Sequence, residues 1–206
     1  MMPELYLAGV ISRDGVIDGS LAARSPRFVP LGRTFSYMLY TGPQTLSITQ
    51  TDVRAIQLAK AALSAGIRLL MDRLGVERVD RIRLAGAFGS HIDVKYAAVL
   101  GMIPDCDLEQ VTSAGNAAGS GARIALLDSR SRATIEALVR RVEKIETAIE
   151  PLFQAHFVDA MAIPHRTADY PSLRKVVDLP VATPTESGGE GPRRRARRAA
   201  TPAQPV

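Results

Sequence analysis

The chain has 206 residues, of which 46% are hydrophobic and 23% are charged, and its formal net charge is +5. This length and composition are typical of one folded domain with a hydrophobic core. Its single cysteine, Cys106, excludes a disulfide framework and a cysteine-ligated iron–sulfur cluster within the chain. No apolar stretch reaches the ~20 residues of a membrane span, and the start lacks a signal-peptide pattern, so we expect a cytoplasmic protein.

The first 50 residues are predicted to form short strands and turns. Residues 5–11 are apolar, Asp14-Gly15 and Asp18-Gly19 indicate turns, and residues 35–40 are rich in strand formers. Nothing before Leu5 completes this segment. We therefore expect it to be the end of a larger domain.

The clearest helix is predicted from its N-cap, Thr49, to its terminal glycine, Gly75. Gln50, Lys60 and Arg68 are placed on its polar side, where most such residues are solvated. The apolar residues recur at three- and four-residue steps, as on a buried helix face. They are Val53, Ile56, Ala59, Leu63, Ile67, Leu70 and Leu74.

Two strand–glycine–helix junctions follow. A strand over 79–84 opens into Gly86-Ala87-Phe88-Gly89, and Asp93 caps the next helix, which runs to about Leu100. A second strand, over 111–114, leads into the glycine-rich residues 115–122. Glycine lets a ligand approach the backbone, and a helix start directs free N–H groups at it, as in many nucleotide sites. A tight turn without a ligand fits each motif equally.

The common phosphate-binding and nucleophile motifs are absent from these junctions. No Gly-Lys-Ser/Thr follows Gly115, and Gly119-x-Gly121 lacks the third glycine of a dinucleotide fingerprint. Ser120 is not in a nucleophile elbow. The histidines are too far apart for metal-ligand spacing, so we expect them to be solvated or hydrogen-bonded. They are His91, His156 and His165.

The C-terminal part is predicted to form two more helices and a tail. The helices are expected over 132–147 and from Pro151 to about Met161. Residues 171–206 are assigned to a disordered basic tail, because large apolar side chains are almost absent after Pro180. Five tail arginines equal the whole charge excess, which leaves the rest of the chain formally neutral. They are Arg193, Arg194, Arg195, Arg197 and Arg198.

The arginine run of the tail can contact phosphates or acidic lipid. A solvated tail is the simpler interpretation, because no aromatic residue is interleaved with the arginines. We therefore do not expect nucleic acid or a membrane as a partner.

Four blocks in collinear order resemble one protein family. They are residues 48–62, 84–89, 101–105 and 115–122. Together they resemble the C-terminal part of the reductive activators of corrinoid proteins. The large domain of that family belongs to the ASKHA superfamily of sugar kinases, heat-shock chaperones and actin. The resemblance covers about residues 3–165, and it implies an α/β fold in which residues 1–170 form one subdomain of an ASKHA ATPase domain.

The resemblance also implies a nucleotide site and a partner. Family members depend on ATP, and an N-terminal [2Fe–2S] ferredoxin domain passes an electron to cob(II)alamin on a corrinoid protein. The product, cob(I)alamin, is the methyl-accepting state. The predicted cofactor-binding residues are those of the superfamily's adenosine motif and the neighbouring junction. They are Gly86, Ala87, Phe88, Gly89, Asn116 and Gly119.

The sequence departs from the family where phosphate and magnesium would bind. It lacks the Asp-x-Gly-Thr-like hairpin that contacts the phosphates and supplies the carboxylate for magnesium. We therefore assign no catalytic or metal-binding residue, and expect weak ATP binding without hydrolysis. Magnesium, the ferredoxin domain and the phosphate-binding lobe would come from a missing part, on a separate chain if the protein is split.

Alternatives remain open for the residues and for the function. Phe88 can be a core residue under the turn, Asn116 can be a helix N-cap, and Gln57 and Lys60 can face the nucleotide. The chain can also be a truncated remnant or a non-catalytic module that docks on a corrinoid protein or methyltransferase. A free-standing kinase is disfavoured, because no aspartate lies in a catalytic-base motif. A homodimer is possible.

Overall fold

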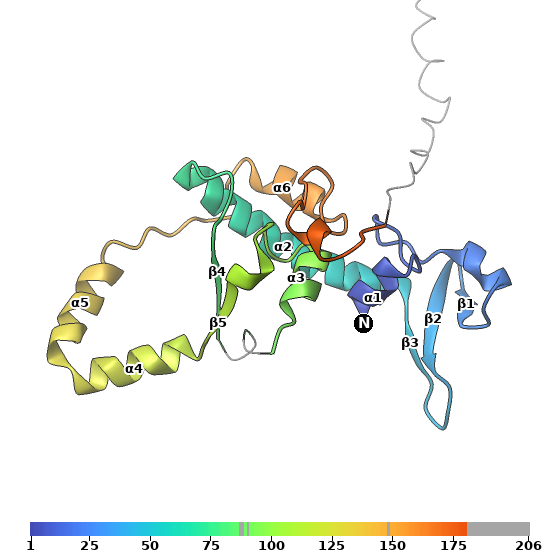
Figure 1. Cartoon of the computed structure of the whole chain (residues 1–206), viewed down its shortest axis with the longest axis horizontal. Helices are drawn as coiled ribbons and strands as arrows, with labels where there is room; N and C mark the ends of the chain where they lie inside the picture. Colours follow the sequence, from blue (N-terminus) through green and yellow to red (C-terminus); the bar gives the residue numbers. More distant parts are fainter. Residues whose placement is uncertain (87–88, 90, 148, 181–206) are drawn as a thin grey trace, which may run out of the picture.

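A computed structural model describes residues 1–86, 89, 91–147 and 149–180. The long helix α2 (Gln50–Leu74) crosses the middle of the molecule, and the other elements are grouped along it (Figure 1). The strands are β1 (Phe28–Leu31), β2 (Thr34–Tyr40), β3 (Leu46–Ile48), β4 (Ile82–Ala85) and β5 (Val111–Gly115). The other helices are α1 (Met2–Leu7), α3 (Val94–Leu100), α4 (Ala117–Leu127), α5 (Ser129–Val139) and α6 (Phe153–Ala160). Short 3-10 segments are η1 (Gly19–Ala23), η3 (Leu108–Gln110) and η4 (Leu173–Lys175).

Both predicted ends of α2 are confirmed. The Thr49 hydroxyl accepts a hydrogen bond from the backbone N–H of Asp52, and the Asp52 carboxylate accepts one from the N–H of Thr49. This reciprocal capping satisfies two of the free N–H groups of the first turn. At the other end Gly75 adopts φ 63°, a left-handed conformation in which glycine is favoured.

The strands form two separate small sheets. β1, β2 and β3 make an antiparallel sheet near the start of α2, and β4 pairs with β5 in parallel. The strands expected over 35–40, 79–84 and 111–114 are confirmed, although β4 begins only at Ile82. The predicted cap Asp93 also accepts the N–H of Tyr96, and α3 ends at Leu100 as expected.

The expected strand at the N-terminus is wrong, because residues 2–7 form α1. Pro3 suits the first turn of a helix, where its missing N–H costs no hydrogen bond. Met2, Leu5 and Tyr6 are spaced three and four residues apart, and all three are buried on one face of α1. This helical spacing distinguishes the segment from a strand.

The predicted domain boundary at residue 170 is also too early. Leu173 is fully buried in the same hydrophobic cluster as Tyr6 and Val99, and Leu179 is buried there too. Residues 171–180 therefore belong to the packed part of the chain. The rest of the predicted tail, residues 181–206, lies outside the described residues.

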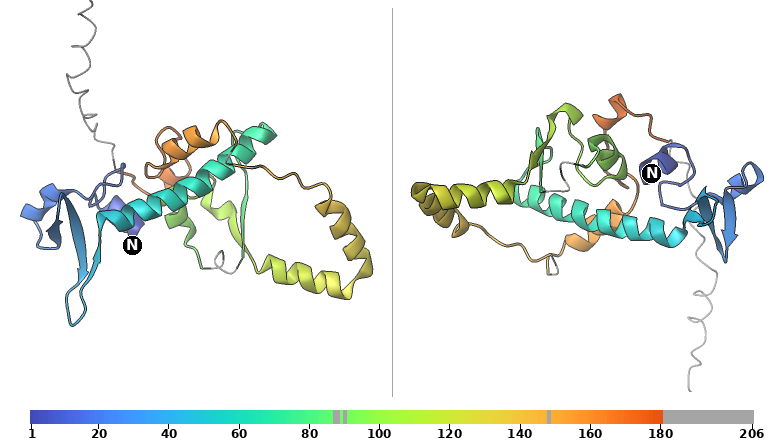
Figure 2. Two further views of the ribbon diagram at one scale, coloured as in Figure 1. Left: turned by 180° about the vertical axis from the view of Figure 1, so that it is seen from behind. Right: turned by 90° about the horizontal axis from the view of Figure 1, so that it is seen from below.

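Helices α4 and α5 extend away from the rest of the molecule (Figures 1 and 2). The helix predicted over 132–147 is observed as Ser129–Val139, and neither α4 nor α5 has a buried residue. Leu127 is 83% exposed and Val142, just beyond α5, is 70% exposed. The apolar side chains of α4 and α5, which we call the arm, are therefore not packed in a core within the described part of the chain.

The polar side of α2 is partly buried, contrary to the expectation of solvated side chains. Gln57 is 1% exposed and Lys60 is 3% exposed. The Lys60 ammonium group donates hydrogen bonds to the backbone carbonyls of Ala162 and Pro164, the latter over 2.7 Å. Hydrogen-bonded carbonyls make the burial of this polar group tolerable.

Two glutamines extend the same contact toward the N-terminal loop. Gln57 Nε2 donates to the carbonyls of Asp14 at 3.1 Å and Met161 at 2.8 Å. At the start of α2, Gln50 donates to the carbonyl of Gly15 and accepts the N–H of Ile17. We call Gln50, Gln57 and Lys60 the α2 clamp, because they bind two loops far apart in the sequence.

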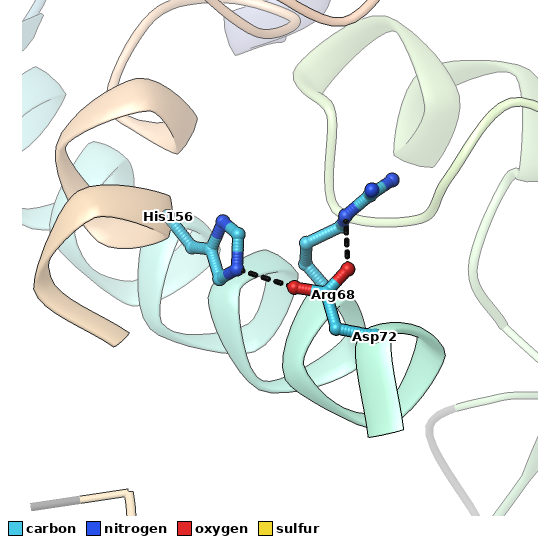
Figure 3. A network of polar contacts seen from close by, with 3 residues as sticks. All are labelled: Arg68, Asp72 and His156. Atoms are coloured by element: carbon cyan, nitrogen blue, oxygen red, sulfur yellow. Dashed lines mark hydrogen bonds and ion pairs between the residues drawn. The ribbon is translucent and has the colours of Figure 1, made fainter. Parts of the chain in front are cut away.

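A second polar contact joins α6 to α2 near its C-terminal end. The Asp72 carboxylate accepts Arg68 Nε at 2.9 Å, and its other oxygen lies 2.7 Å from His156 Nε2 (Figure 3). The side chains are partly exposed, so this pair orients α6 and contributes little net stability, about 1 kcal/mol or less. No helix in the described ranges is both long and apolar enough to span a membrane.

The α2 clamp predicts a specific pH dependence of stability. Burial lowers the pKa of Lys60 to about 7, from 10.5. Between these values the unfolded chain binds more protons than the folded one, so the free energy of unfolding rises with pH. Urea unfolding at pH 7, 8.5 and 10 should show that Lys60→Met loses this rise, on the order of 3 kcal/mol.

The exposed Lys175→Met variant is the matched control, and it should keep the parent's dependence on pH. A Lys60→Met protein that folds and retains the parent's rise would contradict the role of burial in lowering the pKa of Lys60.

Candidate functional site

The two glycine junctions predicted from the sequence lie side by side. β4 and β5 are parallel neighbours, so both strands end at the same edge of their sheet. The N–H of Gly86 donates to the carbonyl of Gly115 at 2.8 Å. Gly86 has φ +106° and Gly115 has φ +60°, and residues with side chains rarely adopt either conformation. The carboxyl edge of parallel strands is where α/β proteins commonly bind ligands.

Gly86 and Gly89 are required for different reasons. Apart from its chain neighbours, no described residue has an atom within 4 Å of the position that a Cβ of Gly86 would occupy, so the described residues leave this side of the turn open. A Cβ on Gly89 would lie 2.8 Å from the carbonyl oxygen of Leu84. Gly89 thus allows the chain to return against the end of β4. The predicted site residues Ala87 and Phe88 lie outside the described residues.

Asn116 is the N-cap of α4, as one of the two interpretations proposed. Its Oδ1 accepts the N–H of Gly119 at 2.9 Å, and a Cβ on Gly119 would approach the Asn116 amide at 2.7 Å. The N–H groups of Ala117 and Ala118 have no hydrogen-bond partner among the described residues. These two donors, at the positive end of the helix dipole, can receive an anionic or carbonyl oxygen.

The residues around these turns offer backbone donors and space rather than acid–base chemistry. Within the described ranges, no group of three or more histidine, cysteine, aspartate or glutamate residues could hold a metal ion. Gln57 and Lys60, which the sequence left as possible nucleotide contacts, are bonded to the loops of the α2 clamp instead. That interpretation is therefore wrong for these two residues.

Three cavities open elsewhere on the molecule. One of about 290 Å³ lies between the second half of α2 and residues 165–171, and one of about 310 Å³ lies beside Gln57 and Arg54. A third, of about 220 Å³, is lined by Tyr6, Arg13 and residues of the C-terminal segment. None of the three is lined by Gly86, Gly89, Asn116 or Gly119.

Sequence reasoning missed the polar residues of the third cavity. Arg13 and Tyr6 belong to the N-terminal 13 residues, whereas His165 and Arg174 lie near the other end of the described chain. No spacing pattern connects them, because only the folding of both segments onto α2 brings them together. Burial and the nearby Lys60 lower the pKa of His165. A regular spacing of buried residues could have shown that these segments are packed, but not that they meet.

Comparisons with known proteins agree with the resemblance found in the sequence. Residues 1–174 match the family described as the C-terminal domain of RACo, the ASKHA domain. The corrinoid activation enzyme RamQ of Eubacterium limosum is 44% identical over 108 residues, which are 52% of this chain and 18% of RamQ. A solved reductive activator for corrinoid, iron–sulfur protein has a TM-score of 0.67 at 30% identity, covering 80% of this chain and 27% of that chain. The expected mixed α/β fold of ASKHA type is confirmed, and this chain spans only a minor part of either relative.

Substitution of glycine by alanine should have opposite effects on stability at Gly89 and at Gly121. Gly89→Ala should lower the free energy of unfolding by about 1–3 kcal/mol, because its Cβ would press on the backbone of Leu84. Gly121→Ala should be neutral or stabilising by up to ~1 kcal/mol, because Gly121 lies inside α4 with no atom within 4 Å of a Cβ. Thermal unfolding of both variants tests this, and equal effects at the two positions would argue against a close approach at Gly89.

Proposed function

Because the chain belongs to the family of the RACo C-terminal ASKHA domain, we propose that it forms the ATP-binding subdomain of an activator of corrinoid proteins. In this role the complete protein supports the reduction of cob(II)alamin to cob(I)alamin for methyl transfer. The observation that carries the proposal is the pair of glycine turns at one edge of β4 and β5, within a chain related to a corrinoid activation enzyme.

The described residues fit the adenosine end of ATP. The open side of Gly86 leaves room for a base or ribose against the backbone, and the free N–H groups of Ala117 and Ala118 are suited to a hydroxyl or phosphate oxygen. Asn116 fixes the start of α4 and so fixes the direction of those donors. ATP, when bound, supplies the binding and hydrolysis free energy for a change in conformation.

The chemical groups for hydrolysis and electron transfer belong to other parts of the protein. Phosphoryl transfer needs magnesium held by a carboxylate and donors around the terminal phosphates. The one cysteine, Cys106, is buried, and burial raises the pKa of its thiol, so it is not a reactive thiolate. We propose that a corrinoid protein is the partner that receives the electron.

The exposed helices α4 and α5 and the exposed side of the parallel sheet offer a surface for the rest of an ASKHA domain. Of the residues of β4 and β5 only Val111 is buried, and a two-stranded sheet has little stability by itself. On α4 and α5, apolar side chains lie exposed on consecutive turns, as at an unmade interface. They are Ile124, Leu126, Leu127, Ile135, Leu138 and Val139. We infer that the remaining ASKHA lobe, on the same polypeptide or another, covers this surface.

A non-catalytic docking module is the second candidate. Three of the cavities formed by described residues lie away from the glycine turns, and a partner can bind at such cavities without nucleotide. The response to ATP separates the two candidates.

We expect the chain to bind ATP weakly, with a dissociation constant of about 1 mM, because one wall of the site supplies only part of the contacts. Calorimetric titration should show this binding in the parent and its loss in Gly86→Val, since valine strongly disfavours φ +106° and fills the open space beside the turn.

Gly32→Val is the matched control for this titration. Gly32 also has a positive φ, +62°, with no atom near its Cβ position, but it lies in the turn between β1 and β2. It should bind ATP like the parent, with folding of both variants checked by circular dichroism. Equal affinity in all three proteins would reject the turn as the site, and no heat at several millimolar ATP would favour the docking module.

Hydrogen exchange tests the surface for the missing lobe. In the chain alone, amides of α4 and α5 should exchange far faster than those of α2, because the arm has no buried side chain. The partner to add is the part of the solved reductive activator's ASKHA domain that this chain does not match. Its addition should slow the exchange of the α4 and α5 amides. Leu127→Asp should abolish this protection, whereas Val176→Asp, also at an exposed apolar residue, should not. Unchanged exchange in the parent would contradict the inferred interface.

A further inference from the structure

The cavity of about 220 Å³ joins the two ends of the described chain. Its lining includes Tyr6 of α1 and Arg13 from the N-terminal part. From the C-terminal part it includes His165, Asp169 and Arg174. Two arginines and one aspartate thus line one small space. We propose that this cavity binds a small oxyanion, a phosphate or carboxylate group, at a site separate from the glycine turns.

Arg13 is held in place by the protein backbone. Its Nη2 donates to the carbonyls of His165 and Arg166, each at 2.5 Å. The N–H of Ile163 in turn donates to the carbonyl of Arg13 at 2.8 Å. The Nε and Nη1 groups of Arg13 have no partner within the described ranges. An anchored guanidinium with free donors suits an oxyanion, because little rotamer entropy is lost on binding.

The Tyr6 side chain contributes to the lining of the cavity. Tyr6 is 3% exposed and its ring packs in the core, yet none of the described residues hydrogen-bonds its hydroxyl. Burial raises the pKa of this hydroxyl, while Arg13 and Arg174 lower it. The hydroxyl can therefore donate a hydrogen bond to a bound oxyanion.

The backbone around Arg174 is held by packing and hydrogen bonds. It belongs to η4, whose Leu173 side chain is fully buried. The Asp105 carboxylate accepts the N–H groups of Ser172 and Leu173, at 3.0 and 3.1 Å. The Arg174 side chain forms no ion pair within the described chain, with Asp169 or with any other carboxylate. Its positive charge at the cavity is therefore available to a ligand.

His165 provides a further donor in its neutral form. Its Nδ1 accepts the N–H groups of Thr167 and Ala168, at 3.3 and 3.0 Å. The neutral ring must then carry its proton on Nε2, which leaves a donor. Asp169, the only carboxylate among the lining residues, suits a donor on the same ligand, such as a hydroxyl. The cavity is smaller than the ~300–1,000 Å³ of drug-sized ligand sites, so it fits a small anion rather than a whole nucleotide.

Thermal unfolding at constant ionic strength tests the site, with chloride replaced by inorganic phosphate or by malonate. We expect phosphate at about ten times its half-saturating concentration to raise the Tm by about 3 °C. Arg174→Gln should need about ten times more phosphate for the same shift. Tyr6→Phe should also weaken the response, and it removes only the hydroxyl. The series with malonate shows whether a dicarboxylate is preferred to phosphate.

Arg33→Gln is the matched control, because it removes the same charge at an exposed position in the turn between β1 and β2. It should respond like the parent. Gly86→Val should also keep the phosphate response, so failure of the ATP site and failure of this site are distinguishable. Equal shifts in Arg174→Gln and Arg33→Gln, or no shift with either anion, would overturn the proposal.

Discussion

The structure depends on the hydrogen bonds by which α2 holds two distant loops. Gln57 and Lys60 are nearly inaccessible to solvent, and their donors are satisfied by backbone carbonyls of residues 14 and 161–164. Gly15 fits this contact because any Cβ there would overlap the Gln57 amide, at 2.3 Å. Such contacts are costly to break, because each carbonyl left unpaired in the interior costs about 1–3 kcal/mol. They fix the N-terminal loop and the C-terminal segment against the same helix.

This arrangement places both candidate sites. The segment held at residues 161–164 continues to Tyr170 and Leu173, which enter the same core as α3 and Val111 of β5. The parallel sheet, and with it the two glycine turns, is thus connected through this core to α2. The small cavity forms where the N-terminal loop and the C-terminal segment meet. One helix with an unusual polar face therefore positions two features that are far apart in the chain.

Local signals explain which parts of this fold the sequence could predict. The capping box at Thr49, the glycine at 75 and the strand-to-glycine junctions depend on residues within a few positions, so they were predicted well. The burial of Lys60 could not be predicted, because its partners are carbonyls about 100 residues away that carry no side-chain signal. The amphipathic pattern of residues 132–147 predicted a helix with one apolar face, and the described chain leaves the helix unburied. Such a pattern shows that a face is to be covered, but not by which chain.

The uncovered surfaces and the open turn have one physical explanation. Apolar residues of α4 and α5 are exposed, and no described residue other than its chain neighbours has an atom within 4 Å of the Cβ position at Gly86. In a site made of backbone donors, affinity comes from enclosure, because water competes for every N–H that remains exposed. A second lobe over this surface would bury the apolar residues and exclude water from the turns at the same time. Packing and ligand binding would then stabilise each other, so that closing the domain and binding a nucleotide are a single coupled equilibrium.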